Sequence, residues 1–537
     1  MLSVSELECR RVSMSSGGEI TPPDSSSRRS SRVIKNDLLL YEAVIKNDVE
    51  AVREVLNEPI DINSRNNYRR APIHWAASKG NTEIMGLLIG AKCDIEAIDK
   101  YGMRPLLMAA WHGNKEAVKM LINAGATVNA INKKGYSVLM CAARNNREDV
   151  VDYLLETLEN IDLEAADNEG MTCLHQAASE GHGKIIAKLL ALSANPNSTD
   201  QKGWTPLHAA SERGHEEVAK LLIEGGAGLE SVDEEGNSPL HLAVENKHTG
   251  LALFLLQANA SLHIKNHKGN TPLHIASSSG CRGIIEALLQ YGSNINCQNK
   301  IGNTPLHLSS EANNMDTVEL LISKGADLNT LNERSQSPMH IAAEYGYTEI
   351  CKLLLAAGAN IEQKEQGGRT PLYIAARGSF TAIVDMIIKT ARLDYPEPEE
   401  NSIMKQQSIN STRRKSRLNS EPRKDQEVIE EVMKKLAWKQ LKEGQWVILA
   451  QQWAFTPDQI KAIQHHFTGP ASYKEHGYRM MMIWLDGLEP EVNPLESLYE
   501  SLIAIDEKRL AESVRKKANA HKQQKDKQNG CSSCRLF

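Results

Sequence analysis

The stretch GWTPLHAA, residues 203–210, decides the fold of this chain because it recurs along the sequence. Its histidine, His208, could serve as a base, as a metal ligand or as a packing residue. Counted at the place of that histidine, the related segments fall at positions 74, 107, 140, 175, 208, 241, 274, 307, 340 and 373. Eight of the nine intervals are 33 residues and one is 35. A fixed period of this size predicts stacked repeats rather than one globular core.

A period of 33 residues, with a turn and two helices in each unit, resembles the ankyrin repeat. In three of the ten segments the histidine is replaced, by Leu107, Met140 and Tyr373. No catalytic or zinc site tolerates these exchanges. The seven histidines are therefore predicted to be structural.

Residues 299–329 illustrate why each unit folds in this way. Asn299 and Gly302 suit the first and last positions of a type I turn at the tip of a β-hairpin. Thr304 suits the N-cap in front of a proline that opens the first helix. Gly325 suits the left-handed residue that ends the second helix. Since no unit buries its apolar face alone, stacking must supply the core.

The repeats are predicted to number about eleven over residues 36–395. The segment 38–62 fits the frame with Tyr41 in the histidine position and is predicted to be the N-terminal cap. The last unit lacks the closing Gly-Ala pair and is predicted to be the C-terminal cap. The 35-residue interval comes from two extra residues in 156–162, where we expect a local bulge.

The composition argues against several functional classes. A net charge of −6 and a pI near 6.3 give no general attraction to nucleic acid. A phosphate-binding loop, a nucleophile elbow and a paired metal-ligand motif are all missing, so we expect neither an enzyme nor a cofactor. The sequence has no signal peptide and no 18-residue apolar run, and those of its nine cysteines that lie in the repeats suit reduced, buried thiols, so a cytoplasmic location is expected.

Two segments of low complexity flank the repeats. Residues 1–35 are rich in serine and are predicted to be a disordered leader open to phosphorylation. Residues 396–424 are predicted to be a basic, solvated linker. Its RRKS motif at 413–416 could also be read by a basophilic kinase, or the run could aid nuclear import.

Residues 425–518 are predicted to form a second domain of about six helices. A capping box at 456–459, Thr-Pro-Asp-Gln, opens one of them. The pattern from Trp446 and Leu449 through Trp453 to Ile483 and Trp484 resembles a death domain, and a generic six-helix bundle is the alternative. Four of the seven tryptophans lie here and are expected to fill a small core: Trp438, Trp446, Trp453 and Trp484.

Ankyrin repeats followed by one death domain resemble the ankyrin repeat and death domain-containing proteins. That resemblance implies an all-α fold, a solenoid with β-hairpin tips linked to a six-helix bundle. It also implies a non-enzymatic signalling adaptor, whose solenoid binds one protein while its death domain binds another death domain.

Partner-facing positions are expected where equivalent residues differ between repeats. Such positions include the turn, the residue after the turn glycine and the pair after Ala-Ala. In the N-terminal half they hold large side chains, which predict a protein-binding row on the concave face of repeats 3–6: Tyr101, Met103, Trp111, Tyr136, Met171 and Trp204. The position after the glycine holds Asn237, Asn270, Asn303, Gln336 and Arg369 in the C-terminal half. The alternative is that Trp111 or Trp204 packs on a neighbouring hairpin.

The ankyrin class also suggests that this chain is a substrate or competitor of an asparaginyl hydroxylase. Enzymes of that kind modify the hairpin asparagine of a Leu-x5-Asp-[Val/Ile/Leu]-Asn motif. Asn329 fits the motif best, whereas Asn63, Asn129 and Asn296 fit it less well.

The tail at 519–537 ends in Cys534-Arg-Leu-Phe, which has the form of a prenylation box, although Arg535 departs from the aliphatic pattern. A basic stretch precedes it, and Cys531 could carry a second lipid. The tail thus predicts attachment to the inner leaflet of a membrane. A tail without lipid is the alternative.

Overall fold

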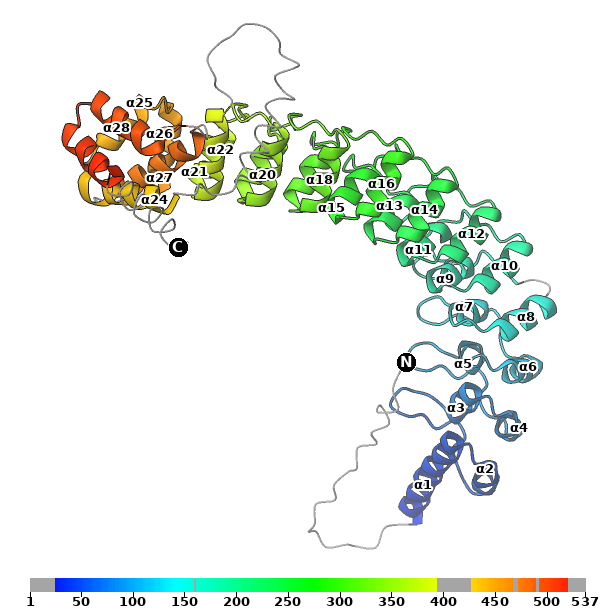
Figure 1. Cartoon of the computed structure of the whole chain (residues 1–537). Coiled ribbons are helices and arrows are strands. Elements are labelled where there is room, and N and C mark those ends of the chain that lie inside the picture. The colour runs from blue at the N-terminus through cyan, green and yellow to red at the C-terminus, as the bar shows by residue number, and fades with distance from the viewer. Residues whose placement is uncertain (1–24, 159–160, 394–425, 467–471, 489–491, 520–537) are drawn as a thin grey trace, which may run out of the picture. The chain divides into compact units, whose positions relative to one another are not determined.

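The computed structural model describes residues 25–158, 161–393, 426–466, 472–488 and 492–519 (Figure 1). Within these residues all regular structure is helical. The chain divides into two compact units, one of residues 1–201 with 220–226 and one of 202–219 with 227–537. Each unit is described by itself.

Helices α1 to α22 follow one another as pairs joined by loops. In the first unit they are α1 (Ser25–Lys46), α2 (Val49–Leu56), α3 (Pro72–Lys79), α4 (Thr82–Gly90), α5 (Pro105–His112), α6 (Lys115–Asn123), α7 (Val138–Arg144), α8 (Glu148–Thr157), α9 (Cys173–Glu180) and α10 (Gly183–Ala191). Helix α12 (Glu216–Glu224) crosses the boundary between the units.

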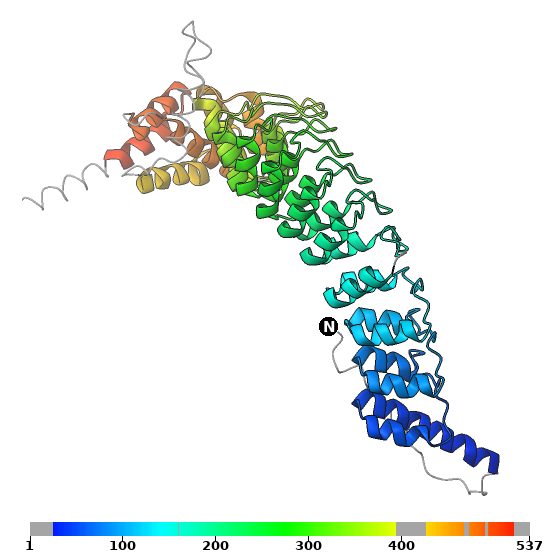
Figure 2. The same cartoon turned by 90° about the vertical axis from the view of Figure 1, so that its right-hand side faces the viewer.

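The second unit continues the pattern. Its paired helices are α11 (Pro206–Arg213), α13 (Pro239–Glu245), α14 (Thr249–Gln257), α15 (Pro272–Ser279), α16 (Arg282–Gln290), α17 (Pro305–Glu311), α18 (Met315–Ser323), α19 (Pro338–Tyr345), α20 (Thr348–Ala357), α21 (Pro371–Arg377) and α22 (Thr381–Leu393). Figure 2 shows the loops that join the green pairs lying side by side along one edge.

The pair α17–α18 shows how the sequence sets these boundaries. Thr304 is the N-cap of α17, its hydroxyl accepts from the backbone N–H of His307, and a proline occupies the first helical turn. Gly325 follows α18 with a φ of 86°, a left-handed conformation that glycine adopts at little cost. The predicted caps of this unit are therefore present.

Packing between neighbouring pairs forms the core. First helices contact first helices, as α15 contacts α17, and second helices contact second helices, as α16 contacts α18. Leu306, Val318 and Leu321 are fully or almost fully buried by this stacking. Ser309 and Ser310 are also buried, and their small side chains allow the close approach of α17 to its neighbours. Burial of these residues in every pair makes stability a sum over neighbours.

The loops between pairs form hairpin-like turns, but none of the described residues is a β-strand. In one tip, Gly302 donates to the carbonyl of Asn299 (3.0 Å) and Asn299 donates to the carbonyl of Asn303 (3.0 Å). Lys300 then donates to the carbonyl of Lys268 in the preceding tip (3.1 Å). With so few ladder bonds on each arm, the predicted β-hairpins are turns linked in series rather than strands.

The N-terminal boundary differs from the expected one. Helix α1 starts at Ser25, so residues 25–35, predicted to be disordered leader, are helical. The serines of this segment are poor helix formers, but the buried part of α1 around Leu40 and Val44 provides a formed helix from which these residues can extend. At the other expected irregularity, α8 ends at Thr157, and residues 159–160 of the predicted bulge lie outside the described residues.

The described part of 426–519 holds a helical bundle. Its segments are α24 (Gln426–Lys435) with the π-helical turn η2 (Leu436–Gln440), α25 (Gln445–Gln452), α26 (Pro457–His466), α27 (Ser472–Gly487), α28 (Pro494–Ala504) and a helix at 508–519. The predicted capping box is present: Thr456 N–H donates to the side chain of Gln459 (3.0 Å), and Gln459 N–H donates to the Thr456 hydroxyl (3.3 Å).

Three of the four tryptophans of the bundle are buried. Trp453 and Trp484 stack with ring centroids 4.1 Å apart, and Trp446 packs against His476. Trp438 is 46% exposed, so the expectation that all four fill the core is wrong. It lies on the π-helical turn and faces solvent beside Lys434 and Lys435, which are also exposed.

The last repeat pair of the second unit packs against the bundle, because α21 contacts α26 and α22 contacts α27. Asp385 forms an ion pair with the buried Arg479 (2.5 Å), and Lys389 pairs with Asp486 (3.1 Å). Arg392 lies over the ring of Phe455 (4.2 Å to the centroid) and donates to the Trp453 carbonyl (2.8 Å). The pair α21–α22, predicted to be an end cap, is thus itself covered.

Helices of the described residues are too short or too polar to cross a membrane.

Candidate protein-binding surface

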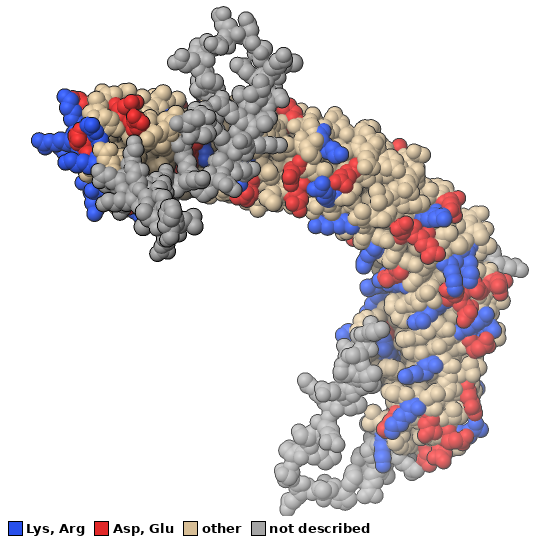
Figure 3. Space-filling view, viewed as in Figure 1, with Lys and Arg blue, Asp and Glu red and all other residues tan. Residues whose placement is uncertain are grey.

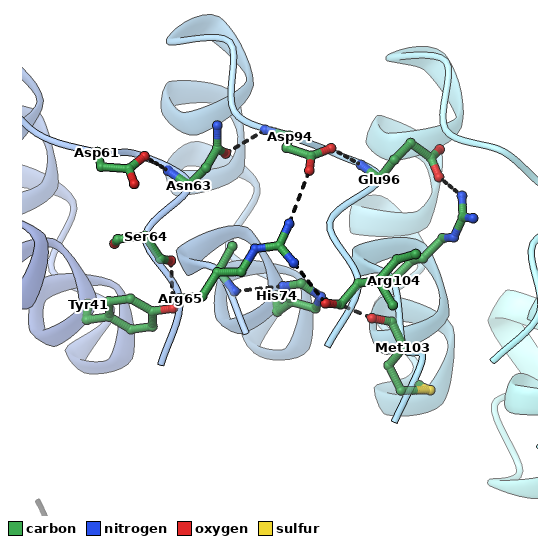
Figure 4. A network of polar contacts seen from close by, with 12 residues as sticks. Tyr41, Asp61, Asn63, Ser64, Arg65, His74, Asp94, Glu96, Met103 and Arg104 are labelled. Carbon is green, nitrogen blue, oxygen red and sulfur yellow. Dashed lines mark hydrogen bonds and ion pairs between the residues drawn. The ribbon is translucent and has the colours of Figure 1, made fainter. Parts of the chain in front are cut away.

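Repeat histidines bond to the backbone of the following repeat, as seen for His74, His208, His241, His274, His307 and His340. In His274, Nδ1 accepts from the backbone N–H of Thr271 (3.1 Å), which leaves Nε2–H to donate to the carbonyl of Asn303 in the following repeat (3.0 Å). His208, His241 and His307 make the same pair of bonds. Figure 4 shows the corresponding bond from His74 to the Met103 carbonyl (3.1 Å).

These histidines are neutral and sealed from solvent. All seven have no exposed surface. Burial lowers the pKa of His241, His274 and His307 to about 4 in each case, because an imidazolium would be desolvated there. A ring with both nitrogens engaged and no access to solvent has no free position for a substrate or a metal.

The histidine position can be filled in other ways. Tyr41 donates to the Ser64 carbonyl (3.0 Å), so a longer side chain reaches the next repeat as histidine does (Figure 4). Leu107 and Met140 are buried there, and Tyr373 is mostly exposed.

A second set of cross-repeat bonds runs through the hairpin asparagines. Asn63 accepts from the N–H of Asp94 (2.7 Å; Figure 4), Asn296 accepts from that of Asp327 (2.9 Å), and Asn329 accepts from that of Asn360 (2.8 Å). Asn329 is half-buried on its loop. Asn63, Asn296 and Asn329, which fit the hydroxylation motif, therefore also hold neighbouring repeats together.

The predicted binding row is only partly exposed. Tyr101 is 52% exposed, and Trp111 and Met171 are half-buried. Met103 and Tyr136 are buried, with 6% and 8% of their surface exposed, so the expectation that they face a partner directly is wrong. Trp204, half-buried in the second unit, has the ammonium of Lys202 5.6 Å from its ring centroid.

The position after the turn glycine explains this burial. There the chain returns from the tip to the next helix, and the side chain packs beneath the adjacent hairpin. In the second unit Asn266 donates to Asn237 (3.0 Å) and Asn299 donates to Asn270 (2.8 Å), so the asparagines of this position cross-link neighbouring tips. The position is part of the scaffold, although its variety suggests a free surface.

Three residues of the first unit form an aromatic and cationic cluster. Trp111 of α5 stacks on Tyr136, with centroids 6.5 Å apart and ring planes 13° apart. Arg144 of α7 lies over the ring of Tyr136 (5.8 Å to the centroid) and forms an ion pair with Glu180 of α9 (3.0 Å). Arg144 also donates to Gln176, which donates in turn to Asp167 (2.8 Å). We call Trp111, Tyr136 and Arg144 the Trp111 cluster.

Part of this arrangement could not be predicted from the sequence. Arg144 and Gln176 stand at helix positions that carry no aromatic signal, so only the fold reveals that they support Tyr136. The exposed Tyr68, Ile98 and Ile131 were also missed, because two of them precede the turn and lie outside the compared positions.

A shallow recess of about 400 Å³ lies among the tips and first helices of the second unit. Asn237, Asn270, Ile275 and Leu308 are among its lining residues. The two asparagines already bond to neighbouring tips. The recess is a furrow of the scaffold rather than an enclosed ligand site.

The remaining candidate chemistry is sparse in the described residues. No group of three or more His, Cys, Asp or Glu residues could hold a metal there. Cys141, Cys173 and Cys351 are free and buried, and burial raises the pKa of each thiol to about 12. Cys93, Cys281 and Cys297 are free and half-buried. Cys531 and Cys534 lie outside the described residues.

A family model described as Ankyrin repeats (3 copies) matches residues 40–132, 125–200, 186–266, 258–332 and 310–397. These overlapping matches cover about two thirds of the chain. Repeats of this kind are protein-interaction modules and generally not catalysts, which implies a protein-binding scaffold with protein partners. The paired helices, the linked tips and the histidine bonds agree with the match, and the chain belongs to the ankyrin repeat family.

Proposed function

We propose that the protein is a signalling adaptor: its repeats bind one protein and its C-terminal bundle binds a death domain. The Trp111 cluster carries the first half of this proposal. Tryptophan, tyrosine and arginine are the residues most enriched at the centres of protein interfaces. Trp111 and Arg144 are half-buried and can contact a partner, whereas Tyr136 is buried and packs against both of them. Ion pairing of Arg144 with Glu180 holds the arrangement in place before a partner arrives.

The second half rests on the resemblance of the bundle to a death domain and on one exposed strip. The strip consists of exposed residues on α24 and η2, with Lys434 and Lys435 each three or four residues from both Glu431 and Trp438. Glu431 already pairs with Lys517 (2.7 Å), which leaves the lysines beside the tryptophan to meet an acidic partner surface. An assembly of this kind weakens as salt concentration rises.

Trp111→Ala combined with Arg144→Ala tests the first half. In quantitative affinity purification, we expect the amount of partner protein captured by the double variant to be at least about tenfold lower than that captured by the wild-type chain. Trp438→Ala with Lys434→Glu serves as a matched variant, and it should lose only the death-domain partner. Unchanged capture by both variants, with helicity preserved, would refute the adaptor sites.

A second candidate function is that of a hydroxylase substrate at Asn329. The observation in its favour is that Asn329 lies half-exposed on a loop while its side-chain oxygen accepts a bond from the next repeat. A mass increase of about 16 Da on the peptide containing Asn329, from cells grown in normal oxygen, supports it. An unmodified peptide counts against it.

We also propose that the tail attaches the bundle to a membrane through Cys534, which lies outside the described residues. The basic stretch before the box supplies the second signal that a single lipid chain requires. Fractionation of wild type against Cys534→Ser distinguishes an anchored adaptor from a freely diffusing one. Equal cytosolic recovery, with no lipid mass on the C-terminal peptide, would remove this part of the proposal.

A further inference from the structure

The first three hairpin tips carry charges of one sign. The residues between the opening Asn or Asp and the post-glycine position include Arg69 in the first tip, Lys100 in the second, and Lys133 and Lys134 in the third. All four are exposed, and these three tips have no acidic residue between those limits. We call these four residues with Tyr68 and Tyr101 the basic tips.

The one carboxylate at the base of these tips is neutralised by the fold. Asp99 is buried, accepts from the N–H groups of Tyr101 and Met103 (2.8 Å each), and accepts from the guanidinium of Arg70 (3.0 Å). The equivalent residues of the other two tips are Asn66 and Asn132, which accept the same backbone bonds without charge. The exposed positive charges are therefore not balanced locally.

The other tips of the same chain provide an internal comparison. The equivalent positions hold Glu169, Lys202, Glu234, Glu235, Lys268, Lys300, Glu333 and Arg334, which sum to zero. Along much of the repeats basic and acidic residues lie interspersed (Figure 3). Three consecutive tips with only positive charge are thus a local feature and not a property of the fold.

Arg69 adds an independent observation. It has a φ of 59° at the position that glycine or serine occupies in the other tips. A long side chain in the left-handed region costs about 1 kcal/mol relative to glycine. Arg69 is exposed, so this tip carries a charged side chain in a backbone conformation that disfavours one.

Apolar surface accompanies the charge. Tyr68 is 39% exposed, Ile98 41%, Tyr101 52% and Ile131 58%. The two tyrosines occupy equivalent places in neighbouring tips, and so do the two isoleucines. Backbone bonds from Lys100 N–H to the Tyr68 carbonyl (2.8 Å) and from Lys133 N–H to the Tyr101 carbonyl (3.1 Å) hold the tips at a fixed spacing. The surface is therefore preorganised.

We propose that the basic tips bind an acidic peptide segment of a protein partner, in which Asp or Glu residues alternate with apolar ones. Charge complementarity selects the acidic residues, and the exposed Tyr and Ile side chains select the apolar ones. A nucleic acid fits less well, because only four unpaired cations are present and the aliphatic side chains between them have no role in phosphate binding. This inference rests on the proposed protein-binding role and assigns it a partner chemistry.

Three labelled probes and the full-length chain test the inference by fluorescence anisotropy. The probes are a twelve-residue peptide of alternating Glu with Leu or Tyr, the same peptide with Gln for Glu, and a twelve-nucleotide oligo-dT. The test variant is Arg69→Glu/Lys100→Glu/Lys133→Glu. The matched control, Lys268→Glu/Lys300→Glu/Arg334→Glu, makes the same charge change at other tips.

We expect the acidic peptide to bind, with affinity lowered at least about tenfold by the test variant and less than about twofold by the control. Tyr101→Ala should also weaken binding, which separates a mixed surface from a purely ionic one. Equal binding of the Gln peptide, equal loss in the control, or tighter and variant-sensitive binding of oligo-dT would each overturn the proposal. Circular dichroism of each variant shows whether it is folded, and neutral Gln substitutions at the same three positions replace any variant that is not.

These outcomes are distinct from failure of the proposed adaptor sites. Peptide binding at the basic tips does not require Trp111. If the Trp111 variant captures its partners normally while the test variant loses the acidic peptide, the proposed site fails and the basic tips stand. The reverse result leaves the Trp111 cluster and removes the basic tips.

Discussion

Histidine in the TPLH segment stabilises this chain only while it is neutral. Each ring accepts one bond within its own repeat and donates another to the next, which requires one protonated and one unprotonated nitrogen. Protonation would turn the acceptor nitrogen into a donor facing another donor. The chemistry that makes histidine useful in catalysis is thus suppressed here by burial and by bonding.

Acid should therefore unfold the repeats well above the pH at which exposed carboxylates are protonated. In the unfolded chain these histidines titrate near about 6.5, whereas burial lowers the pKa of His241, His274 and His307 to about 4. The unfolded state binds more protons below about pH 6.5, so stability is complete above that pH and is lost as pH falls towards 4. At pH 5 each site costs about 2 kcal/mol.

Urea unfolding at pH 7 and pH 5 measures this loss. His274→Leu is the informative variant, since Leu107 shows that an apolar side chain fits this position. It should be less stable than wild type at pH 7 and should show a smaller loss between the two pH values. An unchanged pH dependence in a triple variant of His241, His274 and His307 would contradict the assignment.

At the scale of elements, the hydrogen bonds between neighbouring tips determine how closely successive helix pairs approach each other. Gly302 has a φ of 75°, and a Cβ built there would lie 2.8 Å from the backbone N of Glu333. That nitrogen donates to the carbonyl of Ile301 (3.0 Å), which is one of the links between tips. A side chain at this glycine would separate two neighbouring repeats.

Gly302→Ala is predicted to destabilise the protein more than Gly325→Ala. Both glycines have a left-handed conformation, with φ of 75° and 86°, so alanine is strained to a similar extent at either position. A Cβ at Gly325 meets nothing within 4 Å, whereas one at Gly302 meets backbone. We expect an additional loss of about 1 kcal/mol or more for Gly302→Ala, measured as the difference in urea midpoint. Equal midpoints would show that the neighbouring tip moves away from the added methyl group without loss of stability.

How far the elements could be predicted from the sequence depended on whether a residue's role was local. The cap at Thr304, the turn bond from Gly302 to Asn299 and the capping box at Thr456 involve residues at most four positions apart, and the sequence predicts them. The buried position after the turn glycine depends on a neighbouring hairpin some thirty residues away, as Asn266 and Asn237 show. Different residue types occur at that position in different repeats, which suggests a surface position. In the structure, these different side chains fill the same space beneath the neighbouring hairpin. Trp438 was misplaced for a similar reason, since a bundle core does not use every large side chain.

At the scale of the whole molecule, the second unit includes a contact between the last repeat pair and the C-terminal bundle, which the 33-residue periodicity does not predict. Arg479 is buried against Asp385, and the half-buried Arg392 lies over Phe455, where loss of solvent lowers the pKa of its guanidinium to about 10. These two arginines, one buried and one half-buried, make this junction depend on a few specific partners. The last repeats and the bundle are therefore expected to share stability.

Asp385→Asn tests this dependence. Loss of the carboxylate leaves Arg479 buried without its ion-pair partner, and because Asp385 is partly exposed we expect a cost of about 1–3 kcal/mol. Hydrogen exchange should increase in α21, α22, α26 and α27 together. Asp506→Asn, which removes an exposed pair with Lys508, is the control and should leave exchange unchanged. An increase confined to α27 would show that the two parts are independent.

The histidine bonds described above also have a mechanical consequence. Within the second unit His208, His241, His274 and His307 each attach one repeat to the carbonyl 29 residues further on. A pulling force applied along the stack loads these attachments in series, so the weakest yields first while the others stay closed. Each repeat that opens releases 33 residues, which is roughly 110 Å of extended chain. Force–extension traces would then show steps of that length. The repeats would extend one by one under load and refold when the load is removed.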